Sequence, residues 1–343
     1  MKNEPFKLCN AIVQPGETSS LALPIPEIFN YAPMYIPIKV FHGKVSGPCV
    51  LVIAAIHGNE LNGTEILHRL IKLSLTKKIK GTLIVVPVFN IYGFLSRSRQ
   101  LADGLEIDQY FPGSEVGSHT ARVAHLFISE VFDKANYCID LRTGNFNYSN
   151  LPKIQTDMKN RICAELGYIF RAPILCHATP KLGSIEHYAR VKNIPYLQYE
   201  AGEPLRFNEH SIRVGLKGIV NVLRYLEMIL PVKKISTRVP DSYLIEKIMW
   251  VRASKSGVAH IALSLGQQVK RGQLVAVIAD PFSAAPSINV LAPHDGVVIA
   301  KNDLPIVHEG EALIRLAQFG SHVQTTTTLV DWHNQSTEYV KEM

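Results

Sequence analysis

The chain has 343 residues, with 36 Lys and Arg against 29 Asp and Glu, a formal net charge of +7 and 47% hydrophobic residues. Single cores rarely grow past about 250–300 residues, so this length predicts two domains. The basic excess is mild and contains no basic run longer than Lys77-Lys78-Ile79-Lys80. It therefore favours small anionic ligands and does not by itself indicate nucleic acid.

Apolar runs and cysteine usage indicate the cellular setting. No apolar run approaches the about 20 residues that a membrane-spanning helix needs, and the start of the chain holds no apolar core of signal-peptide length. The cysteines are odd in number, scattered and never in C-x-x-C spacing: Cys9, Cys49, Cys138, Cys163 and Cys176. Such usage is typical of buried thiols in a reducing compartment. We expect a soluble, cytoplasmic protein without a membrane partner, and homo-oligomerisation stays open.

Apolar runs and helical periodicity alternate after a polar leader. Mostly apolar runs predict strands at 35–41, 49–56, 81–88, 137–141 and 195–199. Apolar residues at helical spacing predict helices at 60–73, 118–132, 185–192 and 208–230. Polar stretches at 90–117 and 143–156 are predicted to be loops, and a long loop in a compact domain usually has a function. The alternation predicts an α/β fold with a mainly parallel mixed sheet flanked by helices.

The character of the sequence changes near Pro231. From Trp250 to Leu316, short β runs are separated by glycine turns, which predicts a smaller all-β module. We therefore predict one domain at 1–234, a barrel-sandwich module at 235–320 and a polar tail at 321–343.

The β module has its own resemblance. Its two blocks, Leu265–Ile278 and Ala292–Val298, resemble biotinyl and lipoyl barrel-sandwich domains. That resemblance implies a carrier lysine shortly before the second block, but no lysine lies between Gln273 and Pro293. Covalent biotin or lipoate is therefore not expected. We predict that the module is structural, or that it shapes oligomer contacts or the rim of a cleft.

The segment His57-Gly58-Asn59-Glu60 joins the apolar run at 49–56 to the predicted helix at 60–73. A strand would thus deliver an imidazole and a carboxylate to the carboxyl edge of the sheet, where open α/β sheets bind ligands. Both side chains are zinc ligands, and a catalytic zinc needs three protein ligands and one open position. This pair would supply two of the three.

Further blocks occur in the sequence order of a known family. They are Arg99, Asp103–Gly113, Asp140–Thr143, Asn150–Pro152 and Tyr199–Gly202. Together with His57–Glu60, they resemble the succinylglutamate desuccinylase/aspartoacylase family, which has a zinc carboxypeptidase-like fold. The resemblance spans about residues 35–320.

The resemblance implies roles for matching residues. His57 and Glu60 match two zinc ligands, and Glu200 matches the general base that takes a proton from zinc-bound water. Arg99 matches an arginine that stabilises the oxyanion or holds the substrate.

The main departure concerns the third zinc ligand. The family has Asp-Leu-His-Thr where this chain has Asp140-Leu141-Arg142-Thr143. Arginine keeps its proton in proteins and has no lone pair for a metal. At about 4 Å and an effective dielectric of about 20, a guanidinium and a zinc ion repel by about 8 kcal/mol. An inward-pointing Arg142 would therefore oppose tight zinc binding.

Two further departures alter the substrate-binding positions. The family motif Asp-Leu-Asn-Arg-x-Phe-Pro-Gly reads Glu-Ile-Asp-Gln-Tyr-Phe-Pro-Gly here, which places Asp108 and Gln109 where an asparagine and an arginine hold the substrate carboxylate. The second is Gln155, where the resemblance implies an arginine. We predict Asp108, Gln109, Arg142 and Asn150 as substrate-binding residues.

The new charges suggest two outcomes at the site. Asp108 offers a partner for Arg142, because a buried arginine without a partner would be strongly destabilising. We therefore predict an Asp108–Arg142 ion pair. The competing hypothesis is that another donor completes the zinc site, with candidates Asp108, His119, His177 and His187.

Two functions are compatible with these residues. The first is a zinc-dependent hydrolase that cleaves an N-acyl amide or ester of a small anionic substrate. The second is a catalytically degenerate homologue that has a weakened or lost zinc site and binds a small anionic ligand through Arg142 and Arg99.

Overall fold

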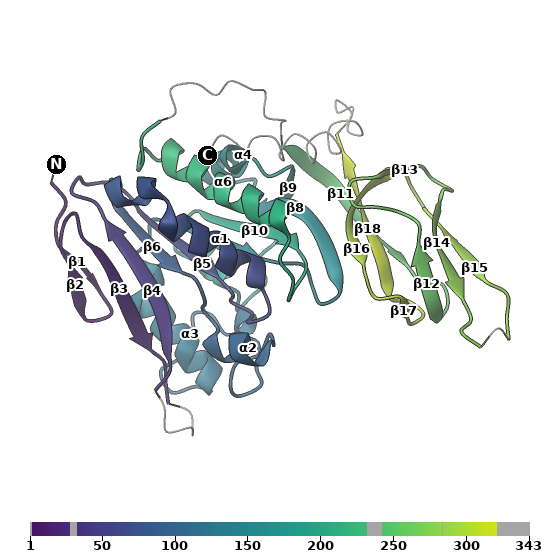
Figure 1. Cartoon of the computed structure of the whole chain (residues 1–343), viewed down its shortest axis with the longest axis horizontal. Helices are drawn as coiled ribbons and strands as arrows, with labels where there is room; N and C mark the ends of the chain where they lie inside the picture. The colour runs from purple at the N-terminus through teal and green to yellow at the C-terminus, as the bar shows by residue number, and fades with distance from the viewer. Residues whose placement is uncertain (1, 28–32, 232–241, 283, 321–343) are drawn as a thin grey trace.

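The computed structural model describes residues 2–27, 33–231, 242–282 and 284–320. A mixed sheet of twelve strands forms its centre (Figure 1). In sheet order the strands are β13 (Gln268–Val269), β16 (Gly296–Asn302), β18 (Ala312–Phe319), β11 (Tyr243–Arg252), β9 (Ile174–His177), β8 (Tyr148–Thr156), β10 (Tyr196–Gly202), β7 (Tyr137–Arg142), β5 (Cys49–Ala54), β6 (Thr82–Val86), β4 (Tyr35–His42) and β3 (Thr18–Pro24). The predicted fold class is confirmed.

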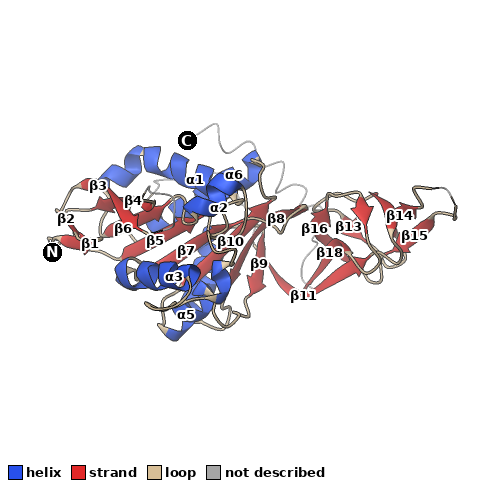
Figure 2. Cartoon of the chain, turned by 90° about the horizontal axis from the view of Figure 1, so that it is seen from below, coloured by secondary structure: helices blue, strands red, loops and turns tan. Residues whose placement is uncertain are grey.

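Helices cover both faces of this sheet. Figure 2 shows α1 (Leu61–Lys72) and α6 (Glu209–Tyr225) on one face, and α3 (His119–Glu130) and α5 (Ile185–Val191) on the other. The short helix α2 (Ile91–Ser96) lies against the turn at Gly58. Three short 3₁₀ helices and one further α-helix complete the helical elements of the described residues: η1 (Ser74–Lys78), η2 (Ile107–Gln109), η3 (Phe132–Lys134) and α4 (Arg161–Phe170). In the described ranges, no helix is long and apolar enough to cross a membrane.

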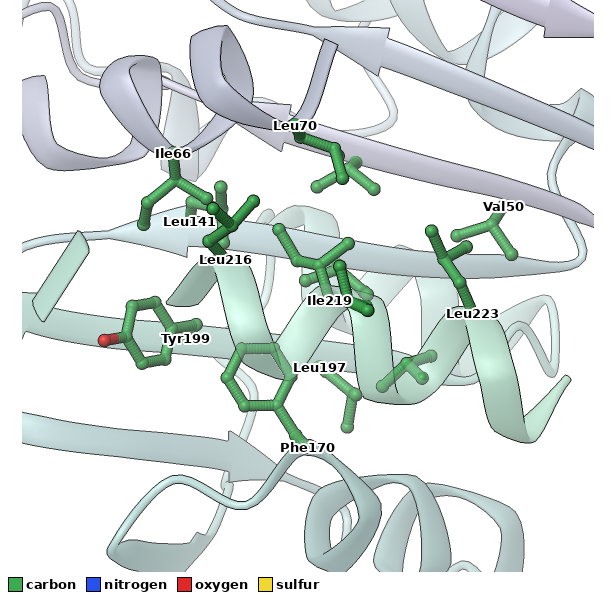
Figure 3. Close-up of a cluster of buried hydrophobic side chains, with 14 of the residues drawn as sticks. Val50, Ile66, Leu70, Leu141, Phe170, Leu197, Tyr199, Leu216, Ile219 and Leu223 are labelled. Atoms are coloured by element: carbon green, nitrogen blue, oxygen red, sulfur yellow. The ribbon is translucent and has the colours of Figure 1, made fainter. Parts of the chain in front are cut away.

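The apolar stripe predicted for the helices forms the main core. Figure 3 shows Ile66 and Leu70 of α1 facing Leu216 and Ile219 of α6 above the sheet, and all four side chains are buried. Such burial stabilises the fold by about 25 cal/mol for each Å² of apolar surface removed from water. All five cysteines are free and four of them are buried, which agrees with the predicted thiols.

The two predicted loops contain regular elements, so these predictions were wrong in part. The stretch 90–117 includes α2 and η2, and the stretch 143–156 includes the nine-residue strand β8. Polar residues such as Asn150, Lys153 and Gln155 made β8 read as a loop, but they turn towards Glu200 rather than solvent. The predictions also assigned no element to α4 and β9, and they extended α6 to residue 230 although it ends at Tyr225.

The polar leader is also folded where it is described. β3 pairs antiparallel with β4 at the edge of the large sheet, and β1 (Phe6–Leu8) pairs with β2 (Ala11–Val13). Their buried side chains, Leu8, Val13 and Leu23, belong to the core that α3 covers.

The β module is built from two packed sheets. A four-stranded sheet of β15 (Ile288–Leu291), β14 (Leu274–Ala279), β12 (Gly257–Ile261) and β17 (Ile306–Val307) packs against the strands β13, β16, β18 and β11. The latter strands continue the large sheet, because β11 pairs with β9 and β16 pairs with β8. The predicted boundary at residues 234–235 and the tail at 321–343 lie outside the described residues.

Candidate functional site

Three parallel strands end at one edge of the sheet. β5 pairs with β7, and β7 pairs with β10. His57 follows the end of β5, Arg142 is the last residue of β7, and Glu200 is the register partner of Arg142 on β10. The carboxyl ends of neighbouring parallel strands thus bring together residues that are far apart in the sequence, at the edge where α/β folds bind ligands.

A tight turn holds His57 and Glu60 together. The Glu60 N–H donates to the His57 carbonyl at 3.1 Å, and His57 Nδ1 lies 3.3 Å from Glu60 Oε1. Both side chains are buried. Gly58 faces the backbone of α2, where a Cβ atom would lie 1.8 Å from the carbonyl carbon of Gly93. The predicted imidazole–carboxylate pair therefore exists, and its turn has no room for a side chain at position 58.

Arg142 points inward and binds two carboxylates. Its Nη1 and Nη2 donate to the two oxygens of Asp108 at 3.0 and 2.9 Å, which confirms the predicted ion pair. Its Nε donates to Asp140 Oδ2 at 2.6 Å. The hydroxyl of Tyr196 donates to the same Asp140 oxygen at 2.5 Å. The guanidinium is thus held from both sides, with only 7% of the residue exposed.

The same guanidinium occupies the position that a zinc ion would need. Arg142 Nη1 lies 3.2 Å from His57 Nδ1, the nitrogen that faces Glu60. Because zinc binds histidine nitrogen at about 2.0–2.1 Å, an ion held by Nδ1 would have to share this space with the guanidinium. In the described residues, no group of three or more His, Cys, Asp or Glu is placed to hold a metal. These side chains, as they are arranged, do not fit a catalytic zinc.

The electrostatics of the cluster favour its charged state. Burial penalises ionised Glu60 and Asp108, but His57 and Arg142 outweigh this and lower the pKa of both carboxyls. Burial also opposes protonation of His57, and the carboxylates of Glu60 and Asp108 outweigh it and raise the pKa of the imidazole. Asp140 differs, because burial raises its pKa to about 6 even beside Arg142. The cluster is thus a set of mutually neutralising charges.

Arg99 reaches the site from the loop after α2. Its Nη2 lies 2.9 Å from His57 Nε2, and its Nε and Nη2 donate to the carboxylate of Glu106 at 3.1 Å each. Nη1 has no polar partner among the described residues, and the side chain is 28% exposed. Arg99 therefore retains one nitrogen, Nη1, without a polar partner in the described part of the chain, and Glu106 is a site residue that the sequence reasoning missed.

Glu200 is clamped by three donors from β8. Its Oε1 accepts from Asn150 Nδ2 at 2.7 Å and is 2.8 Å from Lys153 Nζ, and its Oε2 accepts from Gln155 Nε2 at 2.8 Å. Lys153 is only 2% exposed. Asn150 was predicted as a substrate-binding residue, Gln155 was noted only as a departure from the family pattern, and Lys153 was not singled out. The three residues lie on one strand, β8, and this arrangement could have indicated a shared partner if the segment had not been predicted as a loop.

Four other predicted candidates do not join the cluster. Gln109 is exposed and makes none of the polar contacts described above. His119 begins α3 and His187 lies on α5. His177 ends β9, where its ring accepts from the Met158 N–H at 3.2 Å. Of the proposed replacement ligands, only Asp108 is at the site, and it binds Arg142.

We expect Glu200→Ala to lower the free energy of unfolding by about 1–3 kcal/mol, because it would leave the buried Lys153 ammonium, a hydrogen-bond donor, without its carboxylate. Denaturant unfolding followed by circular dichroism measures the change. Glu203→Ala is the matched control three residues later, since its partner Arg206 is 75% exposed and the surface pair should contribute less than about 1 kcal/mol. Equal stability of the two variants would contradict the clamp.

Solved structures share this fold. A succinylglutamate desuccinylase/aspartoacylase from Rhodobacter sphaeroides superposes with a TM-score of 0.78 at 23% identity, over 88% of this chain and 96% of that chain. The product-bound ectoine utilization protein EutE (DoeB) from Ruegeria pomeroyi gives 0.77 at 21% identity, over 88% and 95%. At this identity the likeness establishes the α/β fold and its C-terminal β module.

Sequence similarity then defines the family. Residues 46–226 match the catalytic domain of succinylglutamate desuccinylase/aspartoacylase, which is more than half of the chain. The chain is also 23% identical over 297 residues to N-alpha-acetyl-L-2,4-diaminobutyric acid deacetylase of Halomonas elongata, covering 82% of this chain and 85% of that protein. The chain therefore belongs to the succinylglutamate desuccinylase/aspartoacylase family, a family of deacylating metallohydrolases.

Proposed function

We propose that this chain is a zinc-independent member of its family, whose cleft binds a small acylated amino acid without hydrolysing it. The observation that carries the proposal is the 3.2 Å contact between Arg142 Nη1 and His57 Nδ1. A fixed guanidinium there supplies positive charge between His57, Glu60 and Asp108. It can donate hydrogen bonds to water, but it cannot coordinate water as a Lewis acid and so lower its pKa, which is what zinc does in a hydrolase.

The clamp on Glu200 supports the same conclusion. A general base needs a free lone pair that reaches the proton it removes. A carboxylate has about four lone-pair sites, and Asn150, Lys153 and Gln155 occupy three of those on Glu200. One site is left on Glu200, so we infer that the three donors reduce its availability for proton removal and hold it as a structural anion on β10.

The charges of the cleft determine the ligand class. Five carboxyl groups face four groups that carry or favour positive charge, so the carboxyls exceed the cations by one: Glu60, Glu106, Asp108, Asp140 and Glu200 against Arg99, Arg142, Lys153 and the His57 imidazole, whose pKa is raised. All three nitrogens of the Arg142 guanidinium donate to Asp108 or Asp140. Arg99 has Nη1 available as a hydrogen-bond donor to a ligand carboxylate. An amino group on the ligand would in turn be attracted by the carboxylate excess. We therefore favour an acylated diamino acid, the class named for the Halomonas relative, over a purely anionic ligand.

Zinc-dependent hydrolysis of an N-acyl amide or ester is the competing function. Its support is that His57, Glu60, Glu200 and Arg99 all lie at one edge of the sheet. It requires Arg142 to leave its two carboxylates and another donor to replace it.

Metal content and hydrolysis distinguish the two functions. We expect purified protein to bind less than 0.1 equivalent of zinc (about tenfold below one ion per chain) after incubation with equimolar zinc and desalting. Arg142→His should bind about one equivalent, because an imidazole completes a three-ligand site and the dication replaces the guanidinium beside Asp108. Mass spectrometry of the metal measures both. Stoichiometric zinc in the wild type that is lost in His57→Ala would overturn the proposal.

Two variants control the zinc measurement. Arg142→Gln removes the charge without adding an imidazole, and Arg97→His adds an imidazole at an exposed position close by in the sequence. Neither should gain zinc.

The proposed ligand class is tested with N-acetyl-2,4-diaminobutyrate. Calorimetry should show binding that weakens at least tenfold in Arg99→Gln, whereas release of acetate by the wild type would support the competing function.

A further inference from the structure

A cavity of about 240 Å³ lies at the opposite end of β10 from Glu200. Its lining comes from the segment after β8, the start of α4, α5 and the start of β10: Asp157, Asn160, Cys163, Pro180, Glu186, Arg190, Asn193, Ile194 and Tyr196. Glu200 lies four residue steps after Tyr196 along the strand, which is about 13 Å. None of the lining residues, all within the described part of the chain, makes a hydrogen bond or ion pair with His57, Glu60 or Arg99, so the cavity is a different site from that cluster.

Glu186 is the unusual residue of this cavity. The other lining carboxylate, Asp157, pairs with Arg190 at 3.4 Å and lies 3.8 Å from His177. Glu186 makes no hydrogen bond or ion pair with any described residue, although it is partly buried. Burial raises its pKa to about 7, and the nearby carboxylate of Asp140 acts in the same direction. A carboxylate held in a cavity without a partner is costly unless a cation or a hydrogen-bond donor joins it.

The polar groups around Glu186 are suited to a ligand with several donors. Asn160 uses its side-chain oxygen to cap α4, and the Asn193 side chain adds an amide to the wall. Arg190 is half exposed and is already paired with Asp157. The one unmatched charge of the cavity is therefore negative, and the volume lies below the about 300–1,000 Å³ typical of drug-sized ligands.

We propose that this cavity is a second binding site, which takes a small primary amine whose ammonium group pairs with Glu186. Its wall is connected to the cleft, because Tyr196 donates to Asp140, and Asp140 accepts from Arg142. The proposal is independent of the function assigned to the cleft.

Calorimetry with 1,4-diaminobutane at pH 8 tests the site, and butane-1,4-diol is the neutral probe of the same size. We expect the diamine to bind with a Kd of about 1 mM or tighter, as six non-hydrogen atoms allow, and the diol to bind at least tenfold more weakly. Equal binding of the two probes, or no diamine binding at concentrations up to about tenfold above that Kd, would overturn the proposal.

Two variants should shift the diamine affinity in opposite directions. Glu186→Gln should weaken binding at least tenfold, because it removes the anion and keeps the shape. Arg190→Gln should tighten binding several-fold, because it removes the cation and frees Asp157. Glu309→Gln, an exposed position in the β module, changes the net charge equally and should have no effect. A Glu186→Gln variant that binds the diamine like the wild type would contradict the assignment.

The thermal stability of the free protein gives a second readout. The pKa of Glu186 is raised from 4.5 to about 7, so the folded state loses stability as the pH rises through that window. The charged groups that set this pKa are Asp140, Arg142, Asp157 and Arg190. We expect Glu186→Gln to have a higher Tm than the wild type at pH 8 and an equal Tm at pH 4. Saturating 1,4-diaminobutane should remove the difference at pH 8, and a difference that persists would count against pairing with the amine.

Discussion

Replacing Arg142 by alanine should lower the free energy of unfolding by about 3–5 kcal/mol, the usual cost of removing one partner from a buried charge cluster. The variant would leave Asp108 and Asp140 without the guanidinium that donates to both. It would also leave a cavity at a residue that is only 7% exposed. Urea or guanidinium unfolding, followed by circular dichroism and fluorescence, measures the loss.

A double-mutant cycle separates the Asp108–Arg142 pair from the cavity. Asp108→Ala combined with Arg142→Ala should cost about 1–3 kcal/mol less than the sum of the single changes. The matched control is the bidentate pair of Arg69 and Glu209, whose side chains are 34% and 49% exposed. That surface pair should show a coupling below about 1 kcal/mol. Additive effects at Asp108 and Arg142 would show that the two charges are not energetically linked.

The second large effect is expected for Gly58→Ala. A Cβ atom there would lie 1.8 Å from the carbonyl carbon of Gly93 and 2.0 Å from the nitrogen of Phe94. Both are backbone atoms of α2, so no side-chain rotation relieves the overlap. We expect a loss above the about 1–3 kcal/mol usual for overpacking, and a shift of the turn that holds His57 and Glu60.

Gly167→Ala is the control for this effect. Gly167 is also buried, in α4, but its added Cβ would meet side-chain atoms at 3.4 Å or more. Because alanine is favoured over glycine in a helix interior, this variant should be as stable as the wild type or up to about 1 kcal/mol more stable. Thermal and denaturant unfolding of both variants provides the comparison, and similar losses would argue against the backbone contact at Gly58.

Periodic segments were predictable and the polar ones were not. The apolar runs of β5 and β7 are buried on both faces, and the stripe of α1 follows the helical period, so each element carries its own signal. β8 carries no such signal, because three of its nine side chains bind the Glu200 carboxylate instead of packing in a core. A polar residue that faces a buried partner is indistinguishable, in the sequence, from one that faces water.

The sequence by itself determined the α/β fold class and the pairing of His57 with Glu60, and its resemblance to the family showed that Arg142 stands where a third ligand is expected. It also predicted Asp108 as the partner of Arg142, because a buried guanidinium requires an anion. Only the tertiary structure decided that Arg142 points to His57 Nδ1 and that its Nε donates to Asp140. It also decided that three β8 side chains bind the Glu200 carboxylate. The reason is physical: these contacts join strands that pair across large sequence separations, and the register of β7, β10 and β8 selects which polar groups meet.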